Sequence, residues 1–311
     1  PQPNWRDDLR DFRKLGAPRL YFGVNSGAMD SMVNHYTAAK RLRSDDAYTP
    51  EGKAGQRPDY AVTVYTKILK EIYPEVPVII GGIEASLRRV THYDYWQNSL
   101  KPSVLVESGA DWLCYGMGER TMLEFTKAIE AGRNVNDIRK IPQLGFYMDG
   151  RCRTKDAVIL NSYERCTKDK VAFAENFHVV ETYANMMHPP VLVEPVGNGY
   201  VQINPTWPPA TQQEMDSFWD LPFTKLPHPR YKGKHIPAFE MIKFSVNTHR
   251  GCFGGCNFCT IAAHQGKFIQ SRSEESIIRE IAALSRLPGF AGNISDVGAP
   301  TANMYGMRGK D

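Results

Sequence analysis

Three cysteines lie within eight residues of one another, in the stretch "NTHRGCFGGCNFCTIAAHQG" (residues 247–266). Cys252, Cys256 and Cys259 follow the spacing C-x3-C-x2-C, and no other cysteine is near them in the chain. A structural zinc ion needs four protein ligands and usually takes them as two separated pairs. An iron–sulfur cluster is normally held by four thiolates, so a loop with three leaves one iron open to a substrate or cofactor. The spacing therefore favours a cluster with one open iron.

A zinc site is the alternative interpretation of the same loop. His249 or His264 would complete a Cys3His ligand set with the three cysteines. The protein would then be a non-enzymatic, zinc-stabilised binding module, for instance one that binds RNA. Such a module predicts zinc in the purified protein, insensitivity to oxygen and a basic face beside the loop.

Composition narrows the setting of the site. The other three cysteines, Cys114, Cys152 and Cys166, are scattered, which is not the spacing of a disulfide framework and suggests a reducing compartment. No apolar run is long enough to span a membrane and no signal peptide is visible, so we expect a cytoplasmic protein. The net charge is only +4 and no basic run occurs, so a nucleic-acid partner is not indicated.

The first part of the chain alternates between strand and helix patterns. We predict strands over residues 18–25 and 76–82, a third within "ADWLCYGMGE" (residues 110–119), and helices over 59–73 and 120–130. This alternation predicts an α/β fold with a doubly wound, Rossmann-like parallel sheet. Ligands of such sheets bind at the carboxyl ends of the strands, where polar side chains such as Glu84 follow here.

The polar residues after the second strand have two interpretations. Glu84, Arg88 and Arg89, with the nearby aromatic residues, would form a polar and stacking site above the sheet. Alternatively the arginines pair with Glu84 and Glu119 at the domain interface and the aromatic rings fill the core. We favour the structural interpretation.

The middle of the chain has weaker patterns. We predict a helix over 162–185, a hairpin that turns at residues 197–199, and a short helix that begins with a capping box of Thr211 and Glu214. Seven prolines occur between residues 205 and 237, which indicates a linker packed along the surface. We therefore expect three parts: an α/β domain over 1–204, a proline-rich linker over 205–237 and a second α/β part over 238–311.

The last part returns to the α/β pattern. A strand is predicted within residues 241–248, a helix over 273–287 and a second strand within "GNISDVGAP" (residues 292–300). The cysteine loop follows the carboxyl end of the first of these strands. Barrel and open α/β enzymes keep their chemistry at this end of the strands.

The cysteine spacing, with Phe258 directly before the third cysteine, resembles the signature of radical SAM enzymes. Further stretches resemble the YgiQ-type radical SAM proteins over nearly the whole chain, namely "MDSMVNHYTA", "DDAYTP", "GGIEASLRRVTHYDYW" and "DVGAPTANMYG". The resemblance implies an N-terminal α/β domain and then a radical SAM barrel with a [4Fe–4S] cluster and S-adenosylmethionine. It also implies an electron donor such as flavodoxin or ferredoxin, and a substrate that it does not name.

Residue by residue, Cys252, Cys256 and Cys259 match the three cluster ligands of that family. Phe258 matches the position that usually lies beside the SAM adenine. The resemblance implies that SAM is cleaved reductively to methionine and a 5′-deoxyadenosyl radical, which abstracts a substrate hydrogen. It assigns no catalytic side chain in this sequence.

Two departures from the family pattern stand out. Where most radical SAM enzymes carry a Gly-Gly-Glu type motif, this chain reads Ser-Asp-Val-Gly, so we expect Asp296 and Gly298 to take part in binding SAM. A solvated or capping role for the carboxylate is the alternative. In addition, residues 238–311 are too few for a barrel, so we expect a truncated chain that holds only its beginning and is not active by itself.

Two further radical SAM subclasses are alternatives for this sequence. A methylthiotransferase-like or methylating enzyme acting on tRNA would carry a second cluster or an RNA-binding appendage, and the sequence shows neither. Gly81 and Gly82 after an apolar strand resemble the Gly-Gly of cobalamin-binding domains, but the D-x-H-x-x-G pattern of those domains is absent.

Overall fold

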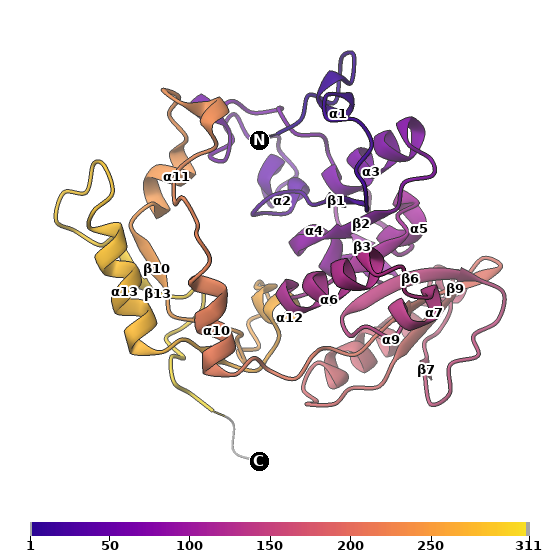
Figure 1. Ribbon diagram of the computed structural model, residues 1–311. Helices are drawn as coiled ribbons and strands as arrows, with labels where there is room; N and C mark the ends of the chain where they lie inside the picture. Colours follow the sequence, from indigo (N-terminus) through magenta and orange to yellow (C-terminus); the bar gives the residue numbers. More distant parts are fainter. Residues whose placement is uncertain (1, 309–311) are drawn as a thin grey trace. The chain divides into compact units, whose positions relative to one another are not determined.

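The computed structural model describes residues 2–308, which form two compact units (Figure 1). The N-terminal unit comprises residues 2–42 and 57–207, and the C-terminal unit comprises residues 43–56 and 208–308. Both units mix helices and strands, so the predicted α/β class is confirmed. Within residues 2–308, none of the helices combines the length and the apolar character needed to cross a membrane.

A seven-stranded sheet organises the N-terminal unit. Its strands lie in the order β1 (Phe22–Val24), β2 (Val78–Gly81), β5 (Trp112–Cys114), β6 (Leu144–Asp149), β9 (Gly199–Ile203), β8 (Leu192–Val196) and β7 (Val158–Ile159). The first three strands run parallel, with Ile79 opposite Trp112 between β2 and β5.

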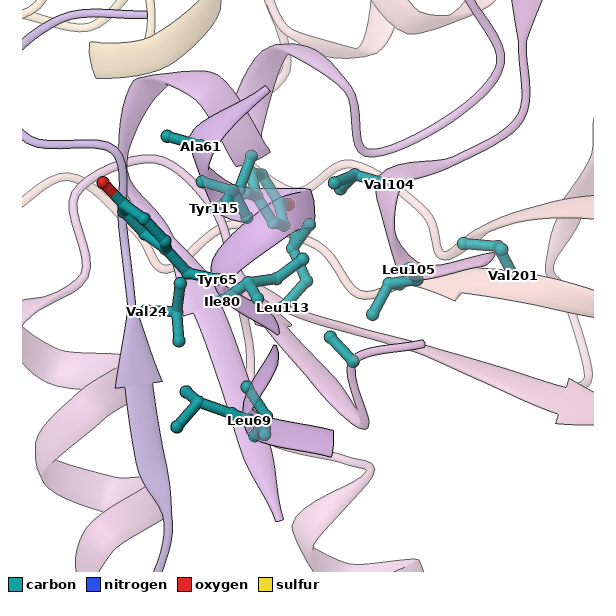
Figure 2. Close-up of a cluster of buried hydrophobic side chains, with 14 of the residues drawn as sticks. Val24, Ala61, Tyr65, Leu69, Ile80, Val104, Leu105, Leu113, Tyr115 and Val201 are labelled. Carbon is teal, nitrogen blue, oxygen red and sulfur yellow. The ribbon is translucent and has the colours of Figure 1, made fainter. Parts of the chain in front are cut away.

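Helices cover both faces of this parallel part. Side chains alternate between the faces of a strand, and in β2 Ile80 belongs to one apolar core while Ile79 belongs to the other. The first core gathers residues of α3 (Ala61–Ile72) and α5 (Val104–Ser108), as Figure 2 shows. The second core gathers residues of α6 (Glu119–Glu130) and α7 (Val135–Ile138). The doubly wound arrangement is therefore confirmed for the parallel strands.

The other half of the sheet is mostly antiparallel, with only the edge strand β7 running parallel to its neighbour β8, and the alternation of strands and helices did not predict this. β6 pairs antiparallel with both β5 and β9. β9 forms the predicted hairpin with β8, and the turn between them uses Gly197 with a positive φ of 58°. At Gly199 of β9 an added Cβ would lie 2.3 Å from the carbonyl oxygen of Met148 in β6, so glycine lets β9 approach β6.

The remaining elements of the N-terminal unit are short, apart from one helix. They are α1 (Arg10–Arg13), α2 (Ser31–His35), α4 (Gly82–Leu87), the pair β3 (His92–Asp94) and β4 (Ser99–Lys101), α8 (Tyr163–Cys166) and α9 (Lys170–Tyr183). The prediction of a single helix over 162–185 is wrong, because this range contains two helices, α8 and α9. Asp169 takes an extended conformation and its side chain accepts a hydrogen bond from Val171 N, which starts a new helix.

The C-terminal unit contains two small strand pairs. β10 (Ser245–Asn247) runs parallel to β13 (Asp296–Gly298), and β11 (His249–Arg250) runs antiparallel to β12 (Gln270–Ser271). The other elements are η1 (Pro50–Gly52), α10 (Gln212–Trp219), η2 (Pro229–Tyr231), α11 (Pro237–Ile242), α12 (Ile261–Gln265) and α13 (Glu274–Leu284). Val246 of β10 packs with Ile277 and Leu284 of α13 in a small core.

The strand predicted within residues 241–248 begins later than expected. Pro237 stands at the start of α11, where proline suits the first helical turn, and the helix continues through Met241 and Ile242. Both side chains are exposed, so their apolar character does not mark a strand of the core. Only residues 245–247 form β10.

The first half of the proline-rich stretch is held against the C-terminal unit by hydrogen bonds. Ala210 N donates to Gln270 Oε1 at 2.7 Å, and Asp216 Oδ1 accepts from Ser273 N at 2.9 Å. The capping box of Thr211 and Glu214 is present at the start of α10, as predicted. The domain boundaries at 204 and 237 stay a prediction.

Glu194 of β8 generates a prediction about stability and pH. Its side chain is 1% exposed and accepts a hydrogen bond from Thr91 N at 2.8 Å, and burial raises its pKa from 4.5 to about 7. At a pH between 4.5 and about 7, the Glu194 carboxyl group is protonated in the folded chain and ionised in the unfolded chain. The free energy of unfolding therefore falls as the pH rises from 4.5 to about 7, by roughly 3 kcal/mol, and is level above that.

Replacing Glu194 by Gln should remove this slope, because the amide does not ionise. Denaturant titrations at pH 5 and pH 8 would measure the free energy of unfolding, with the exposed Glu71→Gln as the matched control. An unchanged pH slope in Glu194→Gln would contradict the assignment.

Candidate metal centre

The cysteine loop lies between β11 and α12, just beyond the carboxyl end of β10 (Figure 1). β10 ends at Asn247, and its parallel partner β13 ends at Gly298. Thr248 N donates to the carbonyl oxygen of Gly298 at 2.7 Å, so the two strand exits remain paired beyond the strands. The loop thus occupies the end of a parallel strand pair where α/β enzymes place their reacting groups.

Hydrogen bonds close the base of the loop. Cys252 N donates to the carbonyl oxygen of Gly266 at 3.0 Å, and Gly251 N donates to Gln265 Oε1 at 3.1 Å. Gly251 has a φ of 91°, and a Cβ added to it would lie 2.1 Å from the carbonyl oxygen of Phe268. Only glycine fits this position, because both its conformation and the neighbouring backbone exclude a side chain.

Two of the three thiols lie close to a second glycine inside the loop, Gly254. A Cβ on Gly254 would lie 3.3 Å from Cys252 Sγ and 3.9 Å from Cys256 Sγ. Gly254 N also donates a weak hydrogen bond to Cys252 Sγ at 3.4 Å. Cys256 is exposed, whereas Cys252 and Cys259 are half-buried. The loop therefore brings two sulfurs near one glycine and keeps all three thiols reachable from solvent.

The donor set suits a thiophilic metal group. Three soft thiolate ligands on one loop favour zinc or iron–sulfur chemistry over hard cations. Cys259 N donates to the carbonyl oxygen of Cys256 at 3.1 Å, a turn that keeps the second and third cysteines on one short arc. Among residues 2–308, no group of three or more His, Cys, Asp or Glu side chains is gathered tightly enough to hold a metal ion as it stands. The loop therefore supplies three ligand side chains of a suitable kind, which are not gathered around one point in the described part of the chain.

His249, in the strand before the loop, makes hydrogen bonds through both ring nitrogens. Its side chain is 1% exposed, Nδ1 lies 2.9 Å from Thr248 Oγ1, and Nε2 lies 3.0 Å from Thr301 Oγ1. Burial lowers the pKa of His249, so the neutral ring donates to one threonine and accepts from the other. Both ring nitrogens are thus occupied, and His249 ties the strand before the loop to the segment after β13.

A buried arginine fixes the strand that leads to the loop. Arg272 is 1% exposed, and its Nη1 donates to the carbonyl oxygen of Asn247, the last residue of β10, at 2.7 Å. The same guanidinium forms an ion pair with Glu280 and donates to Ser276 Oγ at 2.9 Å. Arg272 N also donates to the carbonyl oxygen of Thr248 at 3.0 Å. The residues just before the loop are therefore held in place by Arg272, through its side chain and its backbone amide.

Of the residues expected to bind SAM, Gly298 is at the carboxyl end of β13, whereas Asp296 begins this strand opposite Ser245. Asp296 and Gly298 form the ends of β13, and a Cβ added to Gly298 would lie 3.6 Å from Asp296 Oδ1. The carboxylate of Asp296 is exposed. Phe258 is 91% exposed and so takes no part in the core. The structure thus brings Asp296 and Gly298 together and leaves Phe258 on the surface of the loop.

The carboxyl end of β2 in the N-terminal unit has a structural role. Glu84 is 1% exposed, and its carboxylate accepts hydrogen bonds from Ser31 N and Val62 N, each at 2.8 Å. These amides lie in the first turns of α2 and α3, so one carboxylate caps two helices. Arg88 forms an ion pair with Asp30, the N-cap residue of α2. The structural interpretation is supported for Glu84 and Arg88, but Arg88 pairs with Asp30 and not with Glu84 or Glu119, and the nearby Tyr93 and Tyr95 are exposed instead of filling the core.

Cys114 behaves as the small apolar residue that its surroundings in β5 suggest. It is buried in the second core of the N-terminal unit, and burial raises the pKa of its thiol to about 12. A Cβ on Gly118 would lie 3.0 Å from Cys114 Sγ, so the thiol fills space beside the start of α6.

Sequence reasoning missed several residues that support the loop. Arg272, Gln265 and Thr301 each contact the loop or the strand before it, yet none of them has a role predicted from the sequence, although Gln265 and Thr301 lie within motif stretches. An isolated arginine in a polar stretch gives no local signal, because its partners are fixed only by the pairing of distant strands. The capped start of α13 at Ser273 was the nearest available signal for Arg272.

Comparison with known proteins places these features in a family context. The family model described as "Radical SAM N-terminal" matches residues 1–245. The UPF0313 protein of Bacteroides thetaiotaomicron is 54% identical over 328 residues, which cover 100% of this chain and 52% of that protein. The UPF0313 protein YgiQ of Escherichia coli K12 is 42% identical over 365 residues, which cover 99% of this chain and 49% of that protein. The chain spans about half the length of these curated relatives.

A solved structure was also matched. The radical S-adenosylmethionine methyltransferase TsrM from Kitasatospora setae, with cobalamin and a [4Fe–4S] cluster bound, covers 96% of this chain and 40% of its own at 17% identity and a TM-score of 0.46. The family model ends before the cysteine loop, whereas the similarity to the Bacteroides protein extends over the whole chain.

Gly251 offers a test of how the loop is closed. Gly251→Ala should lower the free energy of unfolding by roughly 2 kcal/mol or more, because the added Cβ meets the Phe268 carbonyl in a left-handed conformation. Gly255→Ala is the matched control, since a Cβ there meets nothing within 4 Å. Denaturant titration of both variants would decide, and equal stabilities would show that the loop does not close as described.

Proposed function

The chain belongs to the UPF0313 (YgiQ-type) family of radical SAM proteins, and on that premise we propose that its cysteine loop holds a [4Fe–4S] cluster at which S-adenosylmethionine is reductively cleaved. Cys252, Cys256 and Cys259 are the proposed cluster ligands, and the fourth iron position is left for SAM. The substrate of the radical is not assigned.

One observation carries this proposal. Three cysteines at the spacing C-x3-C-x2-C occupy a single loop that is closed at its base and lies at the carboxyl end of a parallel strand pair. The sulfurs of Cys252 and Cys256 both lie within 4 Å of where a Cβ on Gly254 would stand. A side chain at that glycine would crowd both sulfurs, and glycine leaves that space open.

When bound and reduced, the cluster supplies the electron that splits SAM into methionine and a 5′-deoxyadenosyl radical, which takes a hydrogen atom from the substrate. The three thiolates of the loop would hold the cluster. Asp296 would accept hydrogen bonds from the SAM ammonium, and Gly298 would leave space beside that carboxylate. Phe258, whose ring is exposed, would stack on the adenine.

The chain's own groups also restrict the motion of the loop. Arg272 holds the end of β10, and His249 joins the strand before the loop to Thr301 after β13. A ligand set held on fixed strands keeps its geometry when the cofactor changes its charge. The loop does not exclude water by itself, because Cys256 and Phe258 are exposed in the described part of the chain.

The zinc-stabilised binding module is less well supported. It needs a fourth ligand, and both ring nitrogens of His249 are already engaged by threonines. His264 would then have to supply that ligand from α12. No observation in the structure favours this arrangement over the cluster.

The setting of the whole protein is part of the proposal. Since the chain covers about half of its curated relatives, the activity belongs to the complete protein and not to this length of chain. We propose a cytoplasmic enzyme that receives its electron from a donor such as flavodoxin or ferredoxin. This compartment suits thiols that stay reduced.

The test is anaerobic purification of the full-length protein with iron, sulfide and zinc quantified. Dithionite and SAM are then added and 5′-deoxyadenosine is followed by chromatography. We expect about four irons per chain and release of 5′-deoxyadenosine. Cys256→Ala should abolish the release, because a loop with two thiolates does not hold the cluster.

Cys152→Ala is the matched control, since it removes a half-buried thiol from the N-terminal unit and should leave iron content and SAM cleavage unchanged. Stoichiometric zinc, with no iron and no cleavage of SAM, would refute the proposal and establish the binding module in its place.

A further inference from the structure

A cavity of about 670 Å³ lies at one end of the sheet in the N-terminal unit. Pro77 and Asp111 line it, and they directly precede the parallel strands β2 and β5 respectively. The cavity therefore lies at the amino ends of these strands. Glu84 follows β2 and so stands at the opposite end, and the cavity shares no lining residue with the cysteine loop.

The sheet itself makes this space, because β5 and β6 part here. β6 pairs with β5 through Leu144 and Gly145, and it stays paired with β9 as far as Asp149. Phe146 and Tyr147, the next residues of β6, line the cavity. Its walls also include residues of α5 and α7, which cover opposite faces of the sheet. The cavity is thus bounded by regular elements of the fold.

The walls of the cavity are mainly apolar. Trp112 and Phe146 contribute aromatic rings, whose centroids lie 5.8 Å apart in an edge-to-face arrangement. Val106 of α5 and Val135 of α7 also line the cavity, and both are exposed. Small-molecule sites are typically concave, apolar and aromatic, with a few polar groups that fix the orientation of the ligand. These walls suit a ligand with an aromatic or other apolar body.

The acidic group of the cavity already has its partners. Asp111 Oδ2 accepts a hydrogen bond from Val78 N at 2.7 Å and forms an ion pair with Lys70 at 2.5 Å. The negative charge of Asp111 is therefore offset within the protein. A cationic ligand would find a carboxylate that is already paired, so Asp111 does not select for one.

The basic group of the cavity, Arg139, has donors to spare. Its Nη1 donates to Asn136 Oδ1 at 3.3 Å, and its guanidinium carbon lies 5.5 Å from the ring centroid of Phe146. Its Nε is buried and has no hydrogen-bond partner within residues 2–308, and in that part of the chain Arg139 forms no ion pair. A guanidinium presents its N–H groups as a planar fork that matches a carboxylate. The charge of the cavity that remains to be met is thus positive.

We propose that this cavity binds a small aromatic carboxylic acid. The apolar body of the ligand packs against Trp112 and Phe146, and its carboxylate accepts hydrogen bonds from Arg139. The proposal does not rest on the function proposed for the cysteine loop, because every group that it uses belongs to the N-terminal unit.

The test is isothermal titration calorimetry of the full-length protein with two probes, 1-naphthylacetate and its amide, 1-naphthylacetamide. The probes share one shape, so the ratio of their affinities reports the contribution of the carboxylate. We expect the acid to bind about tenfold more tightly or better, because a charge-assisted bond to an arginine is stronger than a neutral one. Arg139→Gln should lower the affinity for the acid to that for the amide.

Two further variants separate the site from general effects of charge and folding. Arg133→Gln removes an exposed arginine that does not line the cavity, and should leave both affinities unchanged. Val135→Glu adds a negative charge at an exposed lining position, and should weaken binding of the acid several-fold more than binding of the amide. The thermal midpoint is measured on every variant, so that each affinity refers to a folded protein.

Equal affinities for the acid and the amide in the wild-type protein would overturn the proposal, as would a preference for the acid that survives Arg139→Gln. Binding of neither probe at millimolar concentration would also overturn it. If Arg139→Gln does not fold, Val135→Glu decides, since equal weakening of acid and amide contradicts the proposal. A purified protein without iron that still prefers the acid would refute the proposed function and leave this inference standing.

Discussion

The cysteine loop depends on one buried guanidinium. Arg272 is removed from water, so its N–H groups must be met inside the protein, and they are met by the end of β10, by Ser276 and by Glu280. The first of these bonds reaches the strand that leads into the loop and the other two reach α13, so one side chain joins the strand to the helix. The position of the three thiols relative to the strand pair follows from this requirement, because the loop itself is exposed and contributes little packing of its own.

The N-terminal unit solves a similar problem with the opposite charge. Glu84 satisfies amides at the starts of α2 and α3, and Arg88 pairs with the N-cap Asp30 of α2. These groups stand at the carboxyl end of β2, where a doubly wound sheet would otherwise offer a ligand site. In this unit the polar groups at the strand end hold helices in place, whereas in the C-terminal unit the cysteine loop follows the corresponding end of β10.

The motif and its support come from different parts of the chain. The thiols lie within eight residues, but the groups that contact their loop or the residues just before it include Thr301 after β13, Gln265 in α12 and Trp219 in α10. A compact motif of this kind sets what can be bound. The surrounding contacts set how firmly the ligands are held and which charges stand near them, and these are the quantities that tune a metal group.

The sequence by itself determined the elements and the chemistry that depend on short-range patterns. The helices α3, α6 and α13, the hairpin of β8 and β9, the capping box at Thr211 and the ligand spacing of the cysteines could all be predicted, because their signals lie within a few residues. Only the tertiary structure decided that β6 and β9 extend the sheet in antiparallel fashion and that Met241 and Ile242 belong to a helix. It also decided that Arg272 contacts both the end of β10 and the ring of Trp219. These features depend on pairings between residues far apart in the chain, and a local pattern carries no information about which distant strand, ring or carbonyl will meet a given side chain.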